Sequence, residues 1–261
     1  MGTFEGIILG IIQGLTEFLP VSSSGHLVIF QELLGISATG VTFEVMVHFA
    51  TLLSVLFVFG HDIIRLAKNA LHRNQERHFL LMLLLGIIPT GLMGVLLGDF
   101  FSKLYDSPLI TGFMLLVTGC ILFTLYRIKP GQKNEETMTA LDALLISVAQ
   151  GIAIIPGISR SGSTITAAIW RGLNRETAVR FSFLVSIPVI LGATVLELKE
   201  LPAVGFTMFS GGMLAGMVAA FISGIVAIRF FIKLLAAGRF HYFAYYCWFV
   251  GLLVVCSHYL F

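Results

Sequence analysis

Six apolar runs constrain the fold of this chain more than any other feature of its sequence. Each is close to the roughly 20 residues that a helix needs to cross the hydrocarbon core of a bilayer. They lie at residues 41–59, 79–97, 109–127, 181–196, 208–232 and 242–261. Only 11% of the residues are charged, less than half the share of a typical soluble domain. We therefore predict an all-α integral membrane protein with six transmembrane helices.

Two further apolar stretches, about 4–33 and 140–170, are interrupted by Gly, Pro and Ser in their middles. In lipid, irregular backbone is tolerated only where protein or a water-filled cavity satisfies its polar groups. We predict that both stretches are re-entrant helical segments that line a polar site.

Most of the 16 Lys and Arg residues fall in four clusters that separate the apolar runs. Because such clusters mark cytoplasmic loops, the loops near 99–108 and 197–207 should lie outside. The stretch 4–33 then enters the membrane from the outer face, and the stretch 140–170 enters from the inner face. The cytoplasmic clusters are at 65–77, 127–133, 171–180 and 229–239.

The two interrupted stretches repeat one another at an offset of 137 residues. The matched residues are Gln13 and Gly14 with Gln150 and Gly151, Ser22 with Ser159, Ser24 with Ser161, and Gly25 with Gly162. We predict a single membrane domain, 1–261, built from an inverted-topology internal repeat. Its halves are about 1–127 and 140–261, joined by a cytoplasmic linker, 128–139, in which "KNEET" (133–137) should be solvated. Inverted repeats usually place a polar site near the midplane.

The first stretch carries groups suited to phosphoryl chemistry. Gln13 and Glu17 are four residues apart and share a helix face, and Pro20 ends that helix. Glu17 is suited to binding a divalent cation or accepting a proton. The polar turn that follows offers nucleophilic hydroxyls and an imidazole; it consists of Ser22, Ser23, Ser24, Gly25 and His26.

The second stretch, "PGISRSGST" at 156–164, is suited to binding phosphate. Arg160 offers a guanidinium that can bind two phosphate oxygens. An arginine at membrane depth is costly unless it is paired or lies in a cavity. The helix N-terminus adds partial positive charge, and the remaining candidate ligands are Gly157, Ser159, Ser161, Gly162 and Thr164.

Other polar and aromatic residues have less distinctive surroundings. Glu44 and His48 either line the entrance of the site or lie at the membrane interface. The aromatic residues of the sixth run are typical of an interfacial belt; they are Tyr242, Tyr245, Tyr246 and Trp248. The sequence has no basic patch with interleaved aromatic residues, so we do not expect nucleic-acid binding.

These motifs resemble the undecaprenyl-pyrophosphate phosphatase family, the bacitracin-resistance type of bacterial inner membranes. The resemblance spans nearly the whole chain through "EGIILGIIQGLTEFLPVSSSGHL" (5–27), "PGISRSGST" and "RFSFLVSIPVILGA" (180–193). It implies a multi-pass bundle that removes phosphate from a polyprenyl pyrophosphate at the periplasmic or extracellular face. It also implies dependence on a divalent cation, Mg²⁺ or Ca²⁺.

The family motifs imply roles for individual residues. Gln13 and Glu17 occupy the two positions of the first signature, Ser23 matches the nucleophilic serine, and His26 matches the family histidine. The pyrophosphate-binding Ser-Arg pair corresponds to Ser159 and Arg160. Because Gln13 is not a carboxylate, a mechanism that needs two acidic ligands from this helix does not suit this chain.

Several alternatives stay open from the sequence. Ser23 attacks with His26 as its base, or His26 attacks, or water attacks. An alternating-access transporter or flippase for a polyprenyl phosphate lipid is the competing function, since such carriers also use inverted repeats with broken helices. The sequence leaves the oligomeric state open, a homodimer included.

Overall fold

The computed structural model describes residues 2–35, 40–105, 107–200, 210–236 and 238–260. These residues form twelve α-helices and no β-strand, which confirms the predicted all-α class. The helices are α1 (Thr3–Phe18), α2 (Ser23–Leu33), α3 (Gly40–Val58), α4 (Gly60–Asn69), α5 (Asn74–Leu96), α6 (Gly98–Tyr105), α7 (Pro108–Thr124), α8 (Ala140–Ile152), α9 (Arg160–Trp170), α10 (Arg175–Glu200), α11 (Gly211–Ala236) and α12 (Tyr242–Leu260).

Four of the described helices, α5, α10, α11 and α12, are long and apolar enough to cross a membrane. Two bent pairs, α3 with α4 and α6 with α7, raise the number of candidate spans to six. Each predicted apolar run falls on one of these spans, apart from residues 208, 209 and 261, which lie outside the described part of the chain. The chain is therefore a multi-pass membrane protein.

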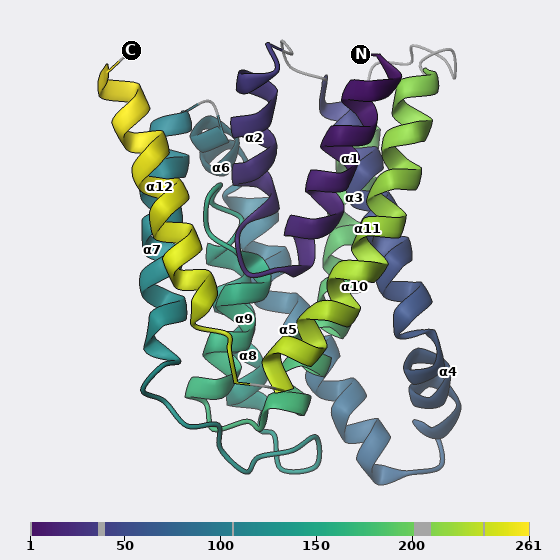
Figure 1. Ribbon diagram of the computed structural model, residues 1–261. Coiled ribbons are helices and arrows are strands. Elements are labelled where there is room, and N and C mark those ends of the chain that lie inside the picture. The colour runs from purple at the N-terminus through teal and green to yellow at the C-terminus, as the bar shows by residue number, and fades with distance from the viewer. Residues whose placement is uncertain (1, 36–39, 106, 201–209, 237, 261) are drawn as a thin grey trace.

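Two helical hairpins enter the bundle from opposite ends (Figure 1). The first hairpin, α1 and α2, starts at the end where both termini lie and turns back near mid-height. The second hairpin, α8 and α9, rises from the opposite end and also turns back inside the bundle. The two turns touch, since a Cβ added at Gly25 would lie 3.4 Å from the Cα of Gly157.

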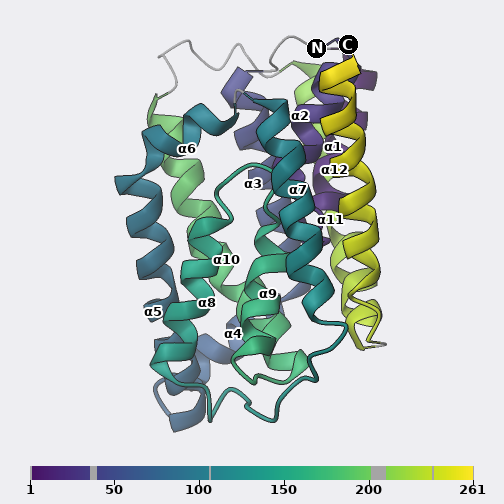
Figure 2. The same ribbon diagram turned by 90° about the vertical axis from the view of Figure 1, so that its left-hand side faces the viewer.

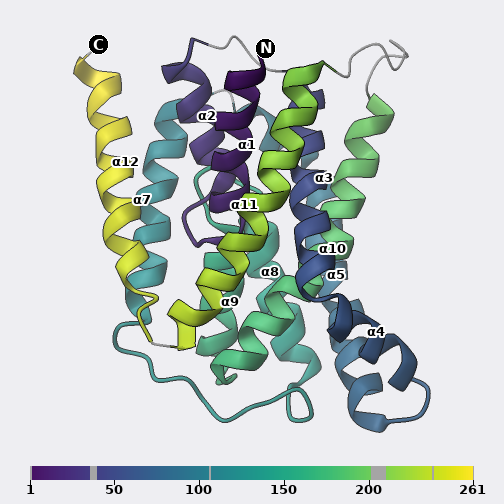
Figure 3. The ribbon, with the colours of Figure 1, turned by 45° about the vertical axis from the view of Figure 1, so that its right-hand side comes forward.

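Corresponding helices of the two halves begin 137 residues apart. This holds for α1 and α8, for α2 and α9, and for α5 and α11. The halves also exchange partners, because α1 packs on α11 whereas α8 packs on α5. The helices α1 and α11 lie side by side in Figure 3. The hairpins are thus held by the spans of the opposite half.

Glycines allow α1 and α11 to approach closely. A Cβ at Gly6 would lie 2.0 Å from the carbonyl oxygen of Gly212, and one at Gly10 would lie 2.1 Å from that of Gly216. Such contact between small residues is how helices associate without a hydrophobic driving force in lipid. Any side chain at Gly6 or Gly10 would push the first hairpin away from its support.

Two local predictions from the sequence need correction. The predicted outer loop 99–108 contains a helix, α6, which lies across the end of the bundle between α5 and α7 (Figure 2). The predicted span 41–59 is confirmed as α3, and α4 follows it at an angle of 66°. The segment 133–137 is not simply solvated, since Lys133 bonds to the buried Asp142 at 2.8 Å and Glu135 pairs with Arg180.

Candidate active site

Serine caps place two helix N-termini in the middle of the bundle. Ser22 precedes α2 and its Oγ accepts a hydrogen bond from the Gly25 N–H at 3.4 Å. Ser159 precedes α9 and its Oγ accepts from the Gly162 N–H at 3.1 Å. Serine is among the best N-cap residues because it satisfies a backbone donor that the helix leaves free. Both α2 and α9 therefore begin at the turns that meet inside the molecule.

An ion pair joins the two hairpins. Arg160 Nη2 donates to Glu17 Oε1 at 2.9 Å, across 143 residues of sequence. The Glu17 side chain is only 5% exposed and the Arg160 side chain 15%. Charges this deep are costly unless they are paired and hydrogen-bonded, so each hairpin supplies the partner that the other requires.

The second oxygen of Glu17 accepts hydrogen bonds from two predicted site residues of its own hairpin. Ser23 Oγ donates to Glu17 Oε2 at 2.5 Å, and Gln13 Nε2 donates to the same oxygen at 3.0 Å. The Ser23 hydroxyl proton therefore points at a carboxylate. This is the arrangement of a nucleophile and a proton acceptor within hydrogen-bond reach.

One nitrogen of the Arg160 guanidinium has no hydrogen-bond acceptor among the described residues. This atom, Nη1, is buried. Leaving a buried charged donor unpaired is expensive, and a guanidinium with one free edge can bind an oxyanion. The described structure thus contains an unpartnered guanidinium donor beside the Glu17 carboxylate, where an oxyanion could bind.

A cavity of about 540 Å³ adjoins these groups. Its polar side includes Glu17, Ser23, Ser24 and Arg160. Its apolar side comes from α5, α6, the α8–α9 turn and α10 and is lined by Gly94, Phe101, Ile154, Ile158, Val189 and Ile190. The cavity is thus suited to a ligand with a charged head and an apolar body.

Glu44 and His48 also line this cavity. His48 Nε2 lies 3.7 Å from Glu17 Oε2, and its Nδ1 donates to the Glu44 carbonyl at 2.8 Å. Of the two placements that the sequence left open for them, the structure places both residues at the cavity.

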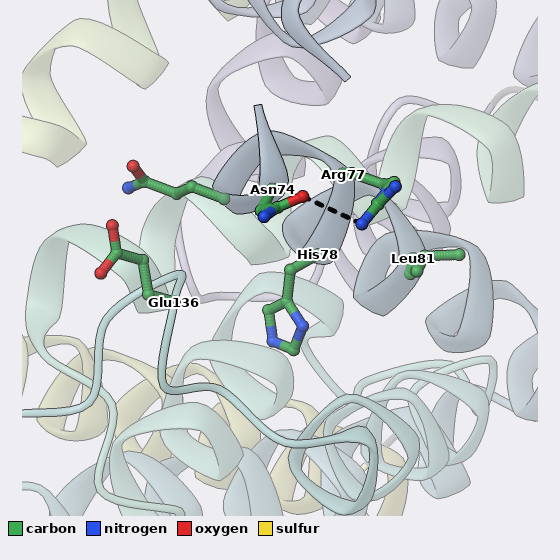
Figure 4. A pocket seen from close by; sticks show the side chains of 6 residues that line it. Asn74, Arg77, His78, Leu81 and Glu136 are labelled. Atoms are coloured by element: carbon green, nitrogen blue, oxygen red, sulfur yellow. Dashed lines mark hydrogen bonds between the residues drawn. The ribbon is translucent and has the colours of Figure 1, made fainter. Parts of the chain in front are cut away.

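A second cavity, of about 610 Å³, lies where α5 meets the linker and contains none of the predicted site residues. Figure 4 shows its lining side chains, with Arg77 Nη2 donating to Asn74 Oδ1 at 2.9 Å. His78 of this cavity is already bonded to the Met138 carbonyl at 2.7 Å. The groups suited to phosphoryl chemistry are therefore in the first cavity.

His26 does not take the place predicted for a base of Ser23. Its Nδ1 bonds to the Ser22 carbonyl at 2.8 Å, and its Nε2 bonds to the Tyr246 hydroxyl at 2.7 Å. The two rings also stack, with centroids 5.6 Å apart and an interplanar angle of 8°. The predicted contact with Ser23 is absent from the bonds of the described residues, because Ser23 bonds to Glu17 instead.

Tyr246 is the residue that sequence reasoning missed. Its sequence signal, one tyrosine among several near the end of a span, was typical of an interfacial belt. It lies 220 residues from His26 in the chain, and nothing in the local sequence marks it as a partner.

The remaining predicted ligands hold the turns in shape. Ser161 Oγ donates to the Leu19 carbonyl at 3.2 Å, and Thr164 Oγ1 donates to the Arg160 carbonyl at 2.9 Å. Gly157 has φ +91° and its carbonyl accepts from Thr118 Oγ1 at 2.8 Å. The N–H groups of Gly25 and Gly162 are occupied by their serine caps, so they are not free to bind an anion.

The carboxylate and imidazole groups of the described residues do not by themselves make a metal centre. No three His, Cys, Asp or Glu side chains among them group as metal ligands. Glu17 offers oxygen ligands, and a hard cation such as Mg²⁺ is commonly held by one or two carboxylates plus substrate phosphates and water. The donor set therefore fits a cation that is bound together with a phosphorylated substrate.

Comparison with known proteins identifies the family. A family model described as bacitracin resistance protein BacA matches residues 6–253. This chain belongs to the BacA family. All of the predicted site residues lie within the matched region.

Several relatives of this chain carry the same name. The chain is 46% identical over 257 residues to the undecaprenyl-diphosphatase of Halothermothrix orenii, covering 98% of each chain. It is 45% identical over 270 residues to that of Alkaliphilus metalliredigens, again covering 98% of each. It is 42% identical over 258 residues to that of Carboxydothermus hydrogenoformans, covering 98% of this chain and 97% of the relative.

Proposed function

We propose that this protein hydrolyses undecaprenyl (C55) pyrophosphate to undecaprenyl phosphate and phosphate. The observation that carries the proposal is the cluster of Glu17, Ser23 and Arg160, which joins both hairpins at one cavity. Relatives at 42% to 46% identity are named undecaprenyl-diphosphatase, which supports the same substrate here. The apolar side of the cavity suits the prenyl chain next to the pyrophosphate.

In this proposal, Arg160 holds the terminal phosphate through its free Nη1 edge, and the N-termini of α2 and α9 add partial positive charge. Ser23 Oγ attacks the terminal phosphorus while its proton passes to Glu17 Oε2. The bond from phosphorus to the bridging oxygen breaks, and undecaprenyl phosphate leaves with that electron pair. Phosphoryl transfer depends mainly on such positioning and charge neutralisation.

Hydrolysis of the phosphoserine completes the cycle. Water attacks the phosphorus, and the Ser23 oxygen leaves and regains the proton held by Glu17. The proton released by the water stays on the phosphate product. Glu17 and Ser23 thus return to their starting states without a further acid or base.

We also propose Mg²⁺ or Ca²⁺ as the cofactor, held by Glu17 together with the substrate. The cation supplies positive charge that offsets the charge of the pyrophosphate. The single carboxylate at the turn supports a cation that enters with the substrate rather than a cage built by protein alone.

The proposed location is the outer side of the bacterial inner membrane. In support, the clusters of Lys and Arg lie on the helix ends and turns at the end of the bundle opposite the two termini (Figure 1), and cationic segments favour the cytoplasm. The first hairpin enters from the end with the termini (Figure 1). Hydrolysis there would recycle the lipid carrier for cell-wall synthesis and confer bacitracin resistance.

The test is phosphate release from a polyprenyl pyrophosphate by purified protein in detergent, with and without EDTA. We expect release by the wild type that EDTA abolishes, and loss of release in Glu17→Ala, Ser23→Ala and Arg160→Ala. No release by well-folded wild type would contradict the proposal and favour the carrier alternative, which a lipid-translocation assay would then examine.

A further inference from the structure

Ser22 has a backbone conformation that serine seldom adopts. Its φ is +68° with ψ +100°, and it is the one non-glycine residue with positive φ in the described part of the chain. Such conformations are disfavoured by the Cβ atom and persist only where surrounding contacts hold them. Ser22 directly precedes Ser23, so its torsion angles set the direction from which Ser23 reaches Glu17.

Both hydrogen bonds to the Ser22 carbonyl come from His26. The Ser22 carbonyl accepts from the His26 backbone N–H at 3.2 Å and from the His26 ring at 2.8 Å. A carbonyl can only accept, so the hydrogen of the imidazole is on Nδ1. This fixes the tautomer and makes Nε2 of the neutral ring an acceptor.

Tyr246 completes the arrangement from α12. Its hydroxyl donates to Nε2 of His26 at 2.7 Å, and its ring stacks on the imidazole. His26 is only 3% exposed, and its ring is therefore fixed at both nitrogens and on one face. Neither nitrogen is directed at Ser23, whose hydroxyl is bonded to Glu17.

We propose that His26 and Tyr246 are positioning residues that hold Ser22 in its strained conformation and so keep Ser23 on Glu17. The inference rests on the proposed function, because it assigns these two residues a role in presenting its nucleophile. Tyr246 acts through His26, and His26 acts through the Ser22 carbonyl. Neither needs to exchange a proton with the substrate.

The first test compares Tyr246→Phe with Tyr245→Phe. The first change removes the hydroxyl and keeps the ring, and Tyr245 is a matched control whose ring contacts Phe123 and Trp248. We expect Tyr246→Phe to lower kcat about 5-fold to 10-fold, the worth of one hydrogen bond. Its KM should stay unchanged because Arg160 still binds the phosphate. Equal kcat values for the two variants would overturn the role of Tyr246.

The second test is a rescue. Glycine adopts positive φ without strain, so Ser22→Gly removes the need for a residue that holds the backbone there. We expect His26→Ala to lose about 10-fold to 100-fold in kcat, the worth of one strained conformation. The double variant, with Ser22→Gly added, should regain at least about 10-fold. A histidine that served as the base would not be replaced in this way, so absence of recovery would overturn the proposal.

Folding is monitored by thermal unfolding of each variant in detergent, so that lost activity is compared only among folded proteins. Wild type is assayed in parallel. If wild type itself released no phosphate, the proposed function would fail. Release by wild type without the expected differences would instead contradict the positioning role alone.

Discussion

The two hairpins have the same construction and different chemistry. In each, a serine caps the second helix, and its Oγ lies 3.3 Å from the Oγ of a second serine two residues later in the chain. The pairs are Ser22 with Ser24 and Ser159 with Ser161. The chemically reactive residues, in contrast, are not repeated between the two hairpins. The positions of Glu17, Ser23 and His26 in the first hairpin are Ile154, Arg160 and Ser163 in the second.

This difference separates what builds a turn inside a membrane from what acts there. Caps, glycines and close helix contacts recur because both turns must satisfy backbone groups in a low-dielectric setting. The repeat does not preserve charge. The first hairpin has the carboxylate and the hydroxyl that bonds to it, and the second has the cation, so neither hairpin alone contains the site.

The backbone also differs at the caps. Ser159 has φ −73°, and the second hairpin has its positive φ at Gly157, where glycine adopts it without strain. The first hairpin has it at Ser22, next to the reacting serine. Strain is therefore found in the hairpin that carries the nucleophile.

The largest effect should come from removing the carboxylate that only the first hairpin has. Glu17→Gln should lower kcat by about 10³-fold, since a positioned proton acceptor contributes roughly 10²-fold to 10⁴-fold. Phosphate release from a polyprenyl pyrophosphate measures it. Glu76→Gln makes the same chemical change at another buried glutamate, outside the cavity, and should leave kcat within about 2-fold. Equal losses would show that the site is not where the hairpins meet.

A second effect should appear on the apolar side of the cavity. A Cβ at Gly94 would lie 3.8 Å from Ile154 Cδ1, so Gly94→Leu should place its side chain where the prenyl group packs. We expect KM for farnesyl pyrophosphate to rise about 10-fold, the worth of roughly two buried methylenes, with little change in kcat. Gly91→Leu is the control, because a Cβ there meets nothing within 4 Å. Similar KM values for both variants would contradict the assignment of the prenyl chain.

The two hairpins carry a glutamine at the same position but use it differently. Gln13 bonds to Glu17, whereas Gln150, at the same place in the second hairpin, donates to Thr90 at 3.2 Å. Gln13→Ala should lower kcat about 5-fold to 10-fold through misplacement of the carboxylate. Gln150→Ala should change kcat less than about 2-fold while lowering the unfolding temperature. A reversed order of the two kcat values would contradict the division of roles.

The smallest effect concerns stability at the base of the second hairpin. Asp142 is buried between Lys133, at 2.8 Å, and Arg171, at 2.7 Å. Burial raises its pKa, but the hydrogen bonds from Lys133, Thr139 and Arg171 outweigh this and lower the pKa to about 2. Asp142→Asn should cost about 1–3 kcal/mol of unfolding free energy.

Because the folded pKa lies below the ordinary value of 3.8, the stabilisation is complete above that pH and is lost as the pH falls toward 2. The difference in unfolding temperature between wild type and Asp142→Asn should therefore be constant from about pH 5 to pH 8 and shrink below about pH 4. A difference that shrank near neutral pH would show that this carboxylate is not held by its cationic partners.

Much of this was predictable from the sequence. The length of the apolar runs predicted the spans. The cost of a charge in lipid indicated that Glu17 and Arg160 each need a partner or a polar cavity. The interior breaks at Pro20 and Pro156 gave the two hairpins. These signals are local, because each depends on what water or lipid does to a nearby group.

The rest depended on contacts between distant segments. The pairing of His26 with Tyr246 joins residues 220 positions apart, and a tyrosine near a span end has the same sequence signal whether it faces lipid or a histidine. Lys133 was expected to be solvated with the rest of 133–137, and its bond to the buried Asp142 forms only when the linker folds against α8. The helix α6 was missed because its apolar residues are few and adjoin a longer run.

The role of Ser23 is tested by identifying the residue that receives the phosphoryl group. Wild type mixed with a polyprenyl pyrophosphate would be quenched within one turnover at neutral pH, and its peptides examined by mass spectrometry. We expect phosphate on Ser23, and none in Ser23→Ala. Phosphate on His26, or turnover of substrate by Ser23→Ala at the wild-type rate, would contradict it.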